Sequence, residues 1–124
     1  MSAQNEIGYK TFTSGEALAK FRRVKLDTDG EVVYADAADG NDWIGVTQHA
    51  TSASGELVVI RLRNTPGTYF LTAANTVDVG DQLFPANDGK VSGDASGTTV
   101  QLVSVEAATL DSIFEAAPGG KASV

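Results

Sequence analysis

The stretch Val24–Tyr34, which reads VKLDTDGEVVY, gives the clearest indication of the fold class. It places the dipeptide Asp29-Gly30 between two short runs that are rich in β-branched residues. An Asp-Gly pair supplies the positive φ that tight hairpin turns need, and β-branched residues favour strands. The stretch therefore predicts a β-hairpin, with strands over Val24–Leu26 and Val32–Tyr34.

The same pattern recurs along the chain. A second Asp-Gly pair, Asp88-Gly89, separates Gln82–Phe84 from Lys90–Val91. The other short strand-like runs are Trp43–Thr47, Leu57–Arg63, Tyr69–Ala73 and Thr99–Val105. Turns that recur this often between short runs indicate a small all-β barrel or sandwich.

The segment 15–22 leaves two structures open. Leu18 and Phe21 stand at helical spacing with Val24, and good helix formers lie between them. A short helix that leads into a strand is therefore as well supported as a strand throughout.

The segment 109–116 also carries apolar residues at helical spacing, with Pro118 placed to stop a helix. An internal repeat favours a strand instead. Residues 29–37, DGEVVYADA, resemble residues 88–95, DGKVSGDA. If the chain has two related halves, the second half continues into a strand over Ser112–Ala116.

The composition is that of one globular domain. The chain has 124 residues, of which 42% are hydrophobic and 20% charged, with a net charge of −7 and no cysteine. The acidic charge disfavours nucleic acid, whose phosphates attract Lys and Arg, and the lack of cysteine excludes a disulfide framework. The longest apolar run, Leu57–Ile60, is far shorter than a membrane span, and the N-terminus lacks the apolar run of a signal peptide. We therefore expect a chain that binds neither nucleic acid nor membranes and stays soluble where it is made.

No group of residues forms a recognisable catalytic or metal-binding motif. His49 is the only histidine and no Gly-x-Ser-x-Gly motif accompanies it, so a Ser-His-Asp triad and a histidine zinc site both lack support. The stretch Asp27–Glu31 resembles the start of a calcium loop, but position 12 of that loop is Ala38, where an EF-hand requires Glu. A hairpin turn explains this stretch better. The sequence predicts no catalytic residue, cofactor or metal, and hence a protein that is not an enzyme.

Two groups of residues are candidates for contacts with other molecules. On the strand expected over Leu57–Arg63, one face mixes apolar residues with arginine, as interfaces do; it consists of Leu57, Val59, Arg61 and Arg63. The basic cluster consists of Lys20, Arg22, Arg23 and Lys25. We expect this cluster on a solvated strand face, with a docking patch for an acidic partner as the alternative.

The order of these motifs resembles that of tailed-phage capsid decoration proteins, also called head-stabilising or cement proteins. The segments that carry the resemblance are Gly15–Leu18, Val24–Val32, Ile44–Val46, Gly55–Leu62, Val79–Phe84 and Asp88–Val91. It implies a β-barrel or β-tulip-like domain, which we place over residues 13–117. An N-terminal arm would span residues 1–12 and a flexible tail residues 118–124.

By this resemblance, the protein would bind the outer surface of a bacteriophage capsid and stabilise the shell. It would form a homotrimer at threefold or quasi-threefold sites, where major capsid proteins meet, after synthesis in the cytoplasm of the bacterial host. Ile7, Tyr9 and Phe12 would anchor the arm along the capsid. The face that runs from Leu57 to Arg63 would contact either the capsid or another subunit.

One alternative is a β-sandwich binding module that recognises a host-surface or carbohydrate ligand. A small enzyme is a further alternative, which no motif supports. The first two hypotheses differ in partner. A virion protein accompanies icosahedral particles in amounts comparable with the capsid subunits, whereas a binding module has affinity for a glycan without any capsid partner.

Overall fold

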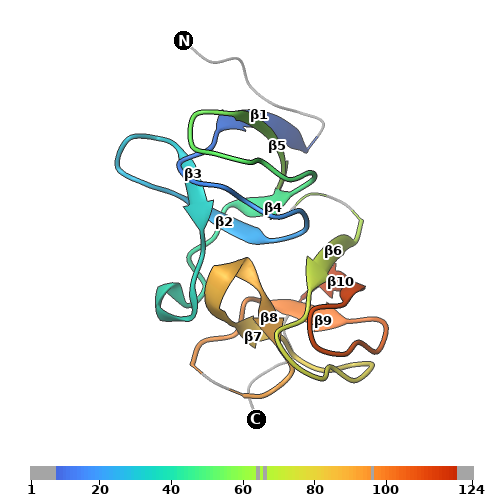
Figure 1. Ribbon diagram of the computed structural model, residues 1–124. Helices are drawn as coiled ribbons and strands as arrows, with labels where there is room; N and C mark the ends of the chain where they lie inside the picture. Colours follow the sequence, from blue (N-terminus) through green and yellow to red (C-terminus); the bar gives the residue numbers. More distant parts are fainter. Residues whose placement is uncertain (1–7, 64, 66, 96, 120–124) are drawn as a thin grey trace.

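The chain folds into a small domain that is nearly all β (Figure 1). The computed structural model describes residues 8–63, 65, 67–95 and 97–119. The strands are β1 (Tyr9–Thr13), β2 (Arg23–Leu26), β3 (Val32–Tyr34), β4 (Gly45–Thr47), β5 (Leu57–Leu62), β6 (Tyr69–Thr72), β7 (Phe84–Pro85), β8 (Val91–Ser92), β9 (Leu102–Ser104) and β10 (Ile113–Pro118). Two short 3₁₀ turns are η1 (Ala37–Asp39) and η2 (Asn87–Gly89). The prediction of a small all-β domain is confirmed.

Five strands form the larger sheet, in the order β1-β5-β4-β2-β3, and every neighbouring pair is antiparallel. The hairpin β2–β3 is the one that the sequence predicted, and it pairs Lys25 with Val33. The carboxylate of Asp27 organises the turn. Its Oδ1 accepts hydrogen bonds from the backbone N–H groups of Asp29 (2.9 Å) and Glu31 (3.0 Å).

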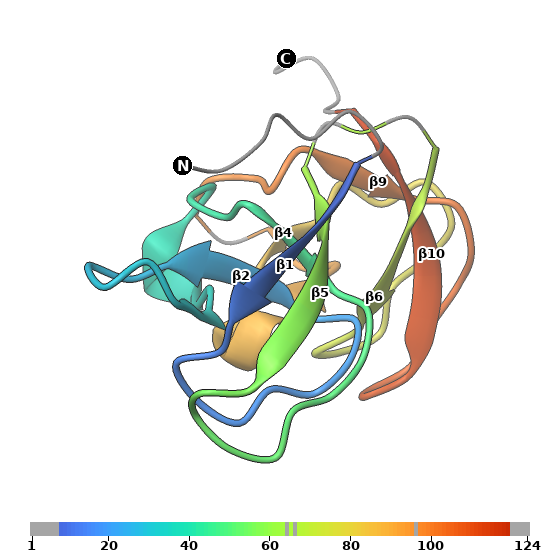
Figure 2. The same cartoon turned by 90° about the horizontal axis from the view of Figure 1, so that it is seen from above.

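Two smaller sheets form the lower layer in Figure 1, below the larger sheet. One has the order β6-β10-β9, and the other is the hairpin β7–β8 around the second Asp-Gly pair. Figure 2 shows the domain from above the larger sheet, with β6 and β10 to the right of β5 in this view. In the described residues each sheet is open at its edges, so the layers enclose the core without closing into one hydrogen-bonded barrel.

The larger sheet buries both of its faces, because its strands alternate apolar residues on each side. The core cluster on its outer face consists of Leu18, Val24, Val32, Val58 and Ile60. The cluster between the layers includes Trp43, Val46, Tyr69, Leu71 and Phe114. The alternation expected along Leu57–Arg63 is therefore present in β5, with Val58 and Ile60 fully buried.

The segment 15–22 forms no helix, so that alternative is not realised. Leu18 exchanges two backbone hydrogen bonds with Thr51, of 3.2 Å and 2.8 Å, and the N–H of Phe21 donates to the carbonyl of Thr47 (2.9 Å). These donors pair with a distant segment instead of with the residue four positions earlier. Leu18 and Val24, which stand at helical spacing in the sequence, are both apolar because both are buried in the outer core cluster.

The second open segment is a strand, as the internal repeat predicted. β10 lies between β6 and β9 and pairs Phe114 with Leu71 and Ala116 with both Tyr69 and Ser104. Phe114 and Ala116 are fully buried. This segment forms a strand and not a helix because it lies at the centre of a sheet, where its backbone pairs with a strand on each side.

The structure places Tyr9–Phe12 in β1, at the edge of the larger sheet, although these residues were expected in the N-terminal arm. Phe12 pairs with Val58 and packs against the outer core cluster, which accounts for its place in the sheet. The Tyr9 side chain remains 39% exposed. Of the three predicted anchors, Phe12 thus packs against the domain's own core.

The two ends of the chain lie partly outside the described residues. Ile7, the third predicted anchor, falls outside them, as do residues 120–124 of the predicted tail. Pro118, also expected in the tail, is the last residue of β10 and pairs with Leu102. An arm and a tail beyond these limits remain predictions.

Candidate interaction surface

Partly exposed apolar side chains lie on both the larger sheet and the β6-β10-β9 sheet, and the Phe21 ring, beside β2, contacts the Phe70 ring on β6. We call this set the seam surface, and it consists of Phe21, Leu57, Val59, Phe70 and Ile113. Leu57 is 69% exposed, Phe70 51% and Ile113 44%, whereas Phe21 and Val59 are half-buried. Single exposed apolar residues are common, but partly exposed apolar residues that include a pair of aromatic rings in contact make this set a candidate interaction site.

Leu57 and Val59 lie on the same side of β5 because side chains alternate along a strand. Two hydrogen bonds of the Val59 backbone join β5 to the chain that follows β4. The N–H of Gln48 donates to the carbonyl of Val59 (3.0 Å), and the N–H of Val59 donates to Nε2 of the exposed His49 (3.1 Å). Two of the four residues of the predicted contact face thus lie on the seam surface.

Phe21 enters the seam surface through a bulge. Its φ of 58° lies in the left-handed region, which bulky residues rarely adopt and which costs roughly 1–3 kcal/mol. Phe21 and Arg22 both bond Thr47, so two residues face one across the strands. The bulge directs the Phe21 ring onto that of Phe70, with centroids 5.5 Å apart. Sequence reasoning missed this residue, because the left-handed conformation is expected of Gly, Asn or Asp.

The β6 and β10 strands supply the other half of the seam surface. Phe70 pairs with Glu115 and lies on the opposite side of β6 from the buried Tyr69. Ile113 pairs with Thr72 and so lies on the same side as Phe70. Lys20 completes the border, with Nζ 5.4 Å from the centroid of the Phe21 ring. Lys20 and Glu115 therefore lie beside the two aromatic residues of the seam surface.

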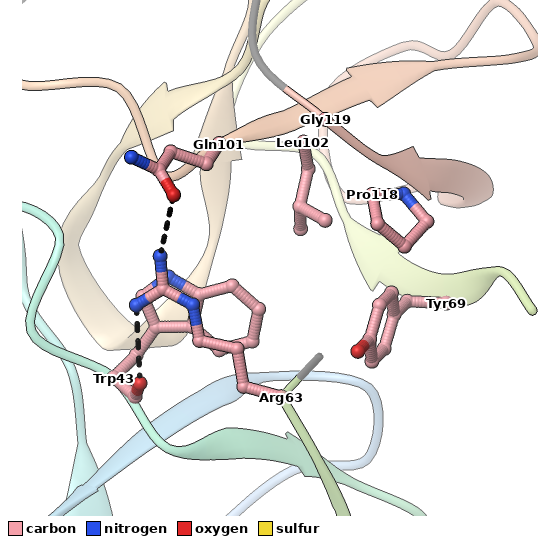
Figure 3. Close-up of a pocket in the computed structure, with 7 residues that line it drawn as sticks. All are labelled: Trp43, Arg63, Tyr69, Gln101, Leu102, Pro118 and Gly119. Atoms are coloured by element: carbon pink, nitrogen blue, oxygen red, sulfur yellow. Dashed lines mark hydrogen bonds between the residues drawn. The ribbon is translucent and has the colours of Figure 1, made fainter. Parts of the chain in front are cut away.

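The two arginines of the predicted contact face are engaged within the chain. The guanidinium of Arg61 lies 5.5 Å from the ring centroid of Tyr9 and 5.0 Å from that of Tyr69, and its Nη1 donates to the Tyr9 hydroxyl (2.9 Å). Arg63 lies 4.4 Å from the ring centroid of Trp43. Both arginines are half-buried. Arg61 and Arg63 therefore contact aromatic rings of their own chain, as Figure 3 shows for Arg63 and Trp43. We assign the contact with other molecules to the apolar residues of the seam surface.

The basic cluster does not form one solvated face, because Arg23 is fully buried. Arg23 pairs with Val46, so its side chain points into the space between the layers. Its Nη2 donates to the carbonyls of Ala35 (3.2 Å), Ala86 (3.0 Å) and Lys90 (2.8 Å). Burial lowers the pKa of the Arg23 guanidinium to about 10. Lys25 forms an ion pair with Asp39 (2.6 Å).

The carboxylates of Asp27, Asp29 and Glu31 gather at the β2–β3 turn, and one oxygen of each lies within 4.8 Å of the others. Asp27 already accepts two backbone N–H groups there. The residue at position 12 of a calcium loop, Ala38, offers no side-chain ligand. The three carboxylates lie at the hairpin turn that the sequence predicted. Their acidic composition is the one feature that suggests a cation.

Within the described residues, no helix has the length and apolar character needed to cross a membrane. No protein-family model matches the chain, and no curated protein matches it. Among solved structures, the chain is similar to one described as the head fiber gp8.5 N base in bacteriophage phi29. That match has a TM-score of 0.74 and 19% sequence identity, and it covers 94% of this chain and 98% of that chain. The two chains therefore share a fold over nearly their whole lengths.

Proposed function

We propose that this chain is a structural protein of a bacteriophage virion, located on the outer surface of the head. The observation that carries the proposal is the fold shared with a phage head fiber base over 94% of the chain. The resemblance of its turn and strand motifs to capsid decoration proteins points the same way. A virion protein also needs no catalytic group, in keeping with a sequence that contains one histidine and no cysteine.

In the finer form of this proposal, the protein binds the major capsid protein as a homotrimer at threefold or quasi-threefold sites. Three linked copies engage three capsid neighbours at once, and avidity can then exceed single-site affinity by about 10²–10⁴. A protein that binds the intact shell and not the broken one stabilises the shell by mass action. The oligomeric state and the threefold position come from the family resemblance alone.

The seam surface is the contact area that we assign to this role. Aromatic residues are enriched and charged residues depleted at the centre of protein interfaces. The seam surface has that composition, with Phe21 and Phe70 at its centre and Lys20 and Glu115 at its border. It contacts either the capsid or a second copy of the chain.

The stabilising role is tested by adding purified protein to expanded heads that lack it and following DNA release on heating. We expect release to shift to higher temperature as occupancy rises. Equal release with and without saturating protein would contradict stabilisation. Failure of the protein to bind heads at all, or its absence from purified virions, would contradict the broader proposal.

The trimer is tested separately, by reconstructing decorated heads and averaging density around each symmetry axis. Three copies around a threefold or quasi-threefold axis are expected. Isolated monomers would contradict the trimer while leaving a virion role intact. The same density would reveal whether an arm that includes Ile7 runs along the capsid, as the sequence predicts.

A further inference from the structure

The chain contains three Asp-Gly dipeptides, and the structure places them in three different environments. They are Asp29-Gly30 at the β2–β3 turn, Asp39-Gly40 at the end of η1 and Asp88-Gly89 at the β7–β8 turn. In such a dipeptide the backbone nitrogen of the glycine can attack the side-chain carboxyl carbon of the aspartate, because glycine has no side chain to obstruct the approach. In a folded protein this reaction requires a carboxyl group that can rotate and space for the ring that forms.

The glycines themselves do not distinguish the three sites. Each glycine N–H donates one hydrogen bond of nearly the same length to a backbone carbonyl. The bonds run from Gly30 to Asp27 (3.1 Å), from Gly40 to Ala37 (3.2 Å) and from Gly89 to Ala35 (3.1 Å). All three glycines also have a positive φ, of 78°, 57° and 71° in chain order. A difference in reactivity must therefore come from the aspartate side chains and from the surroundings of each turn.

The Asp39 side chain is held by both of its carboxylate oxygens. Its Oδ1 accepts a hydrogen bond from Nζ of Lys25 (2.6 Å), and its Oδ2 accepts one from the backbone N–H of Asp36 (2.8 Å). The hydrogen bond from Lys25 lowers the pKa of Asp39. Before Gly40 can attack, the carboxyl group must leave these partners and take up the proton that lets its hydroxyl group depart as water. The surroundings of Asp39 therefore oppose the reaction.

The turn that carries Asp88 is docked, and its peptide group is held on both sides. Gly89 is buried, and an added Cβ there would lie 2.5 Å from the carbonyl oxygen of Arg23. The Asp88 carbonyl accepts a hydrogen bond from Nη1 of Arg22 (2.9 Å). Ring closure alters this same peptide group, so the turn must separate from β2 before the reaction can occur.

The Asp29 side chain lies at the exposed tip of the β2–β3 turn, which projects from the domain at the left of Figure 2. Its carboxylate forms no hydrogen bond or ion pair with any described residue. The neighbouring carboxylates of Asp27 and Glu31 are acceptors and cannot hold it when ionised. An added Cβ at Gly30 would meet nothing within 4 Å. The Asp29 carboxyl group can therefore rotate towards the glycine nitrogen, and the turn has room for a ring.

We propose that Asp29 is a site of spontaneous backbone modification, at which aspartate converts into isoaspartate. The Gly30 nitrogen forms a bond to Cγ of Asp29, and its proton leaves with a side-chain hydroxyl group as one water molecule. The product is a five-membered succinimide. Water then adds to the main-chain carbonyl carbon of Asp29 and breaks its bond to the Gly30 nitrogen, so the chain continues through Cγ. Addition of water to Cγ instead restores aspartate.

The modification changes the turn that Asp27 organises. The main chain gains one carbon between residues 29 and 30, and a carboxylate is then attached directly to it. Oδ1 of Asp27 accepts the N–H groups of Asp29 and Glu31, which lie on the two sides of the added carbon. Turn geometry sets the register of a hairpin, so the modification acts on β2 and β3. The proposal is independent of the virion role.

The test is to incubate the native protein at mildly acidic pH, well below its melting temperature, and to map its peptides by mass spectrometry. Isoaspartyl peptides keep the mass of the original but separate by chromatography, and fragmentation assigns the position. We expect about two- to fivefold more isoaspartate at position 29 than at position 39, because the pair with Lys25 must break there. We expect at least about tenfold more than at position 88, because the docked turn must open there.

The same chain incubated in denaturant is the control, since all three dipeptides then react at similar rates. Similar rates at the three positions of the native protein would overturn the proposal. So would faster reaction at position 39 or 88, or a native protein that forms no isoaspartate at position 29 while the denatured control does.

Two variants that melt normally identify the cause. Asp29→Glu keeps the charge but would require a six-membered ring, so we expect modification at position 29 to be lost and that at the other two positions to be unchanged. Lys25→Met removes one partner of Asp39, and we expect isoaspartate at position 39 to rise by about two- to fivefold while position 29 is unaffected. An unchanged rate at position 39 would contradict the inference that side-chain partners control the reaction.

Discussion

The two Asp-Gly turns have the same dipeptide in very different surroundings. At the β2–β3 turn, Gly30 has a φ of 78°, and an added Cβ would meet nothing within 4 Å. At the β7–β8 turn, Gly89 has a φ of 71° and is buried, and an added Cβ would lie 2.5 Å from the carbonyl oxygen of Arg23. The dipeptide therefore predicts the turn and its positive φ, but not whether the turn faces solvent or the core.

The second turn is buried because it docks on β2. The N–H of Gly89 donates to the carbonyl of Ala35 (3.1 Å). The buried guanidinium of Arg23 donates to the carbonyls of Ala86 and Lys90, on either side of the turn. The β7–β8 turn thus joins the two layers of the domain, whereas the β2–β3 turn is exposed at its tip.

The largest difference between the turns is expected for substitutions of the two glycines. Gly89→Val combines a strained φ with a backbone clash, and we expect it to lower the free energy of unfolding by about 3–5 kcal/mol or to prevent folding. Chemical denaturation measures the loss. A loss below about 1 kcal/mol would contradict the docked position of this turn.

Arg23→Met tests the partner of the buried turn. It leaves three carbonyls without their charged donor but also removes a buried charge, and we expect a net loss of about 1–3 kcal/mol. Lys25→Met, two residues along β2, is the matched control. It breaks only the partly exposed pair with Asp39 and is expected to cost below about 1 kcal/mol. Equal losses would mean that Arg23 does not join the layers.

Gly30→Val tests the free tip, where only backbone strain opposes the side chain. We expect a loss of about 1–2 kcal/mol, clearly smaller than that of Gly89→Val. Asp29→Val is the control, because Asp29 does not have a positive φ. It should cost about 0.5 kcal/mol or less. A cost at Asp29 as large as that at Gly30 would contradict this turn geometry.

The smallest effect concerns pH and the ion pair beside β2. The hydrogen bond from Lys25 lowers the pKa of Asp39, so this pair stabilises the fold above the ordinary aspartate pKa and loses its effect as pH falls through the lowered value. The pKa of Lys25 is raised, so its contribution is lost only in strongly alkaline solution. Asp39→Asn should therefore flatten part of the acid decline in unfolding free energy. An unchanged decline would contradict the pair.

Most of the strands and the turns could be predicted from the sequence, because alternation and Asp-Gly are local signals, but β1 was expected in the N-terminal arm. The burial of Arg23 and the conformation of Phe21 could not be predicted in this way. Arg23 stands in a run of basic residues that looks solvated, and only the packing of the lower layer on β2 buries it. Phe21 adopts a left-handed conformation that long-range pairing with Thr47 imposes. Leu57 and Val59 were found because they share a predicted strand face.

The most direct test of the proposed role compares head binding by three forms of the protein. Phe70→Ser alters the centre of the seam surface, and Leu110→Ser alters an exposed apolar residue outside it that is 63% exposed. We expect the wild type and Leu110→Ser to bind undecorated heads equally, and Phe70→Ser to bind at least about tenfold more weakly while melting normally. Equal binding by all three would contradict the seam surface, and no binding by the wild type would contradict the virion role itself.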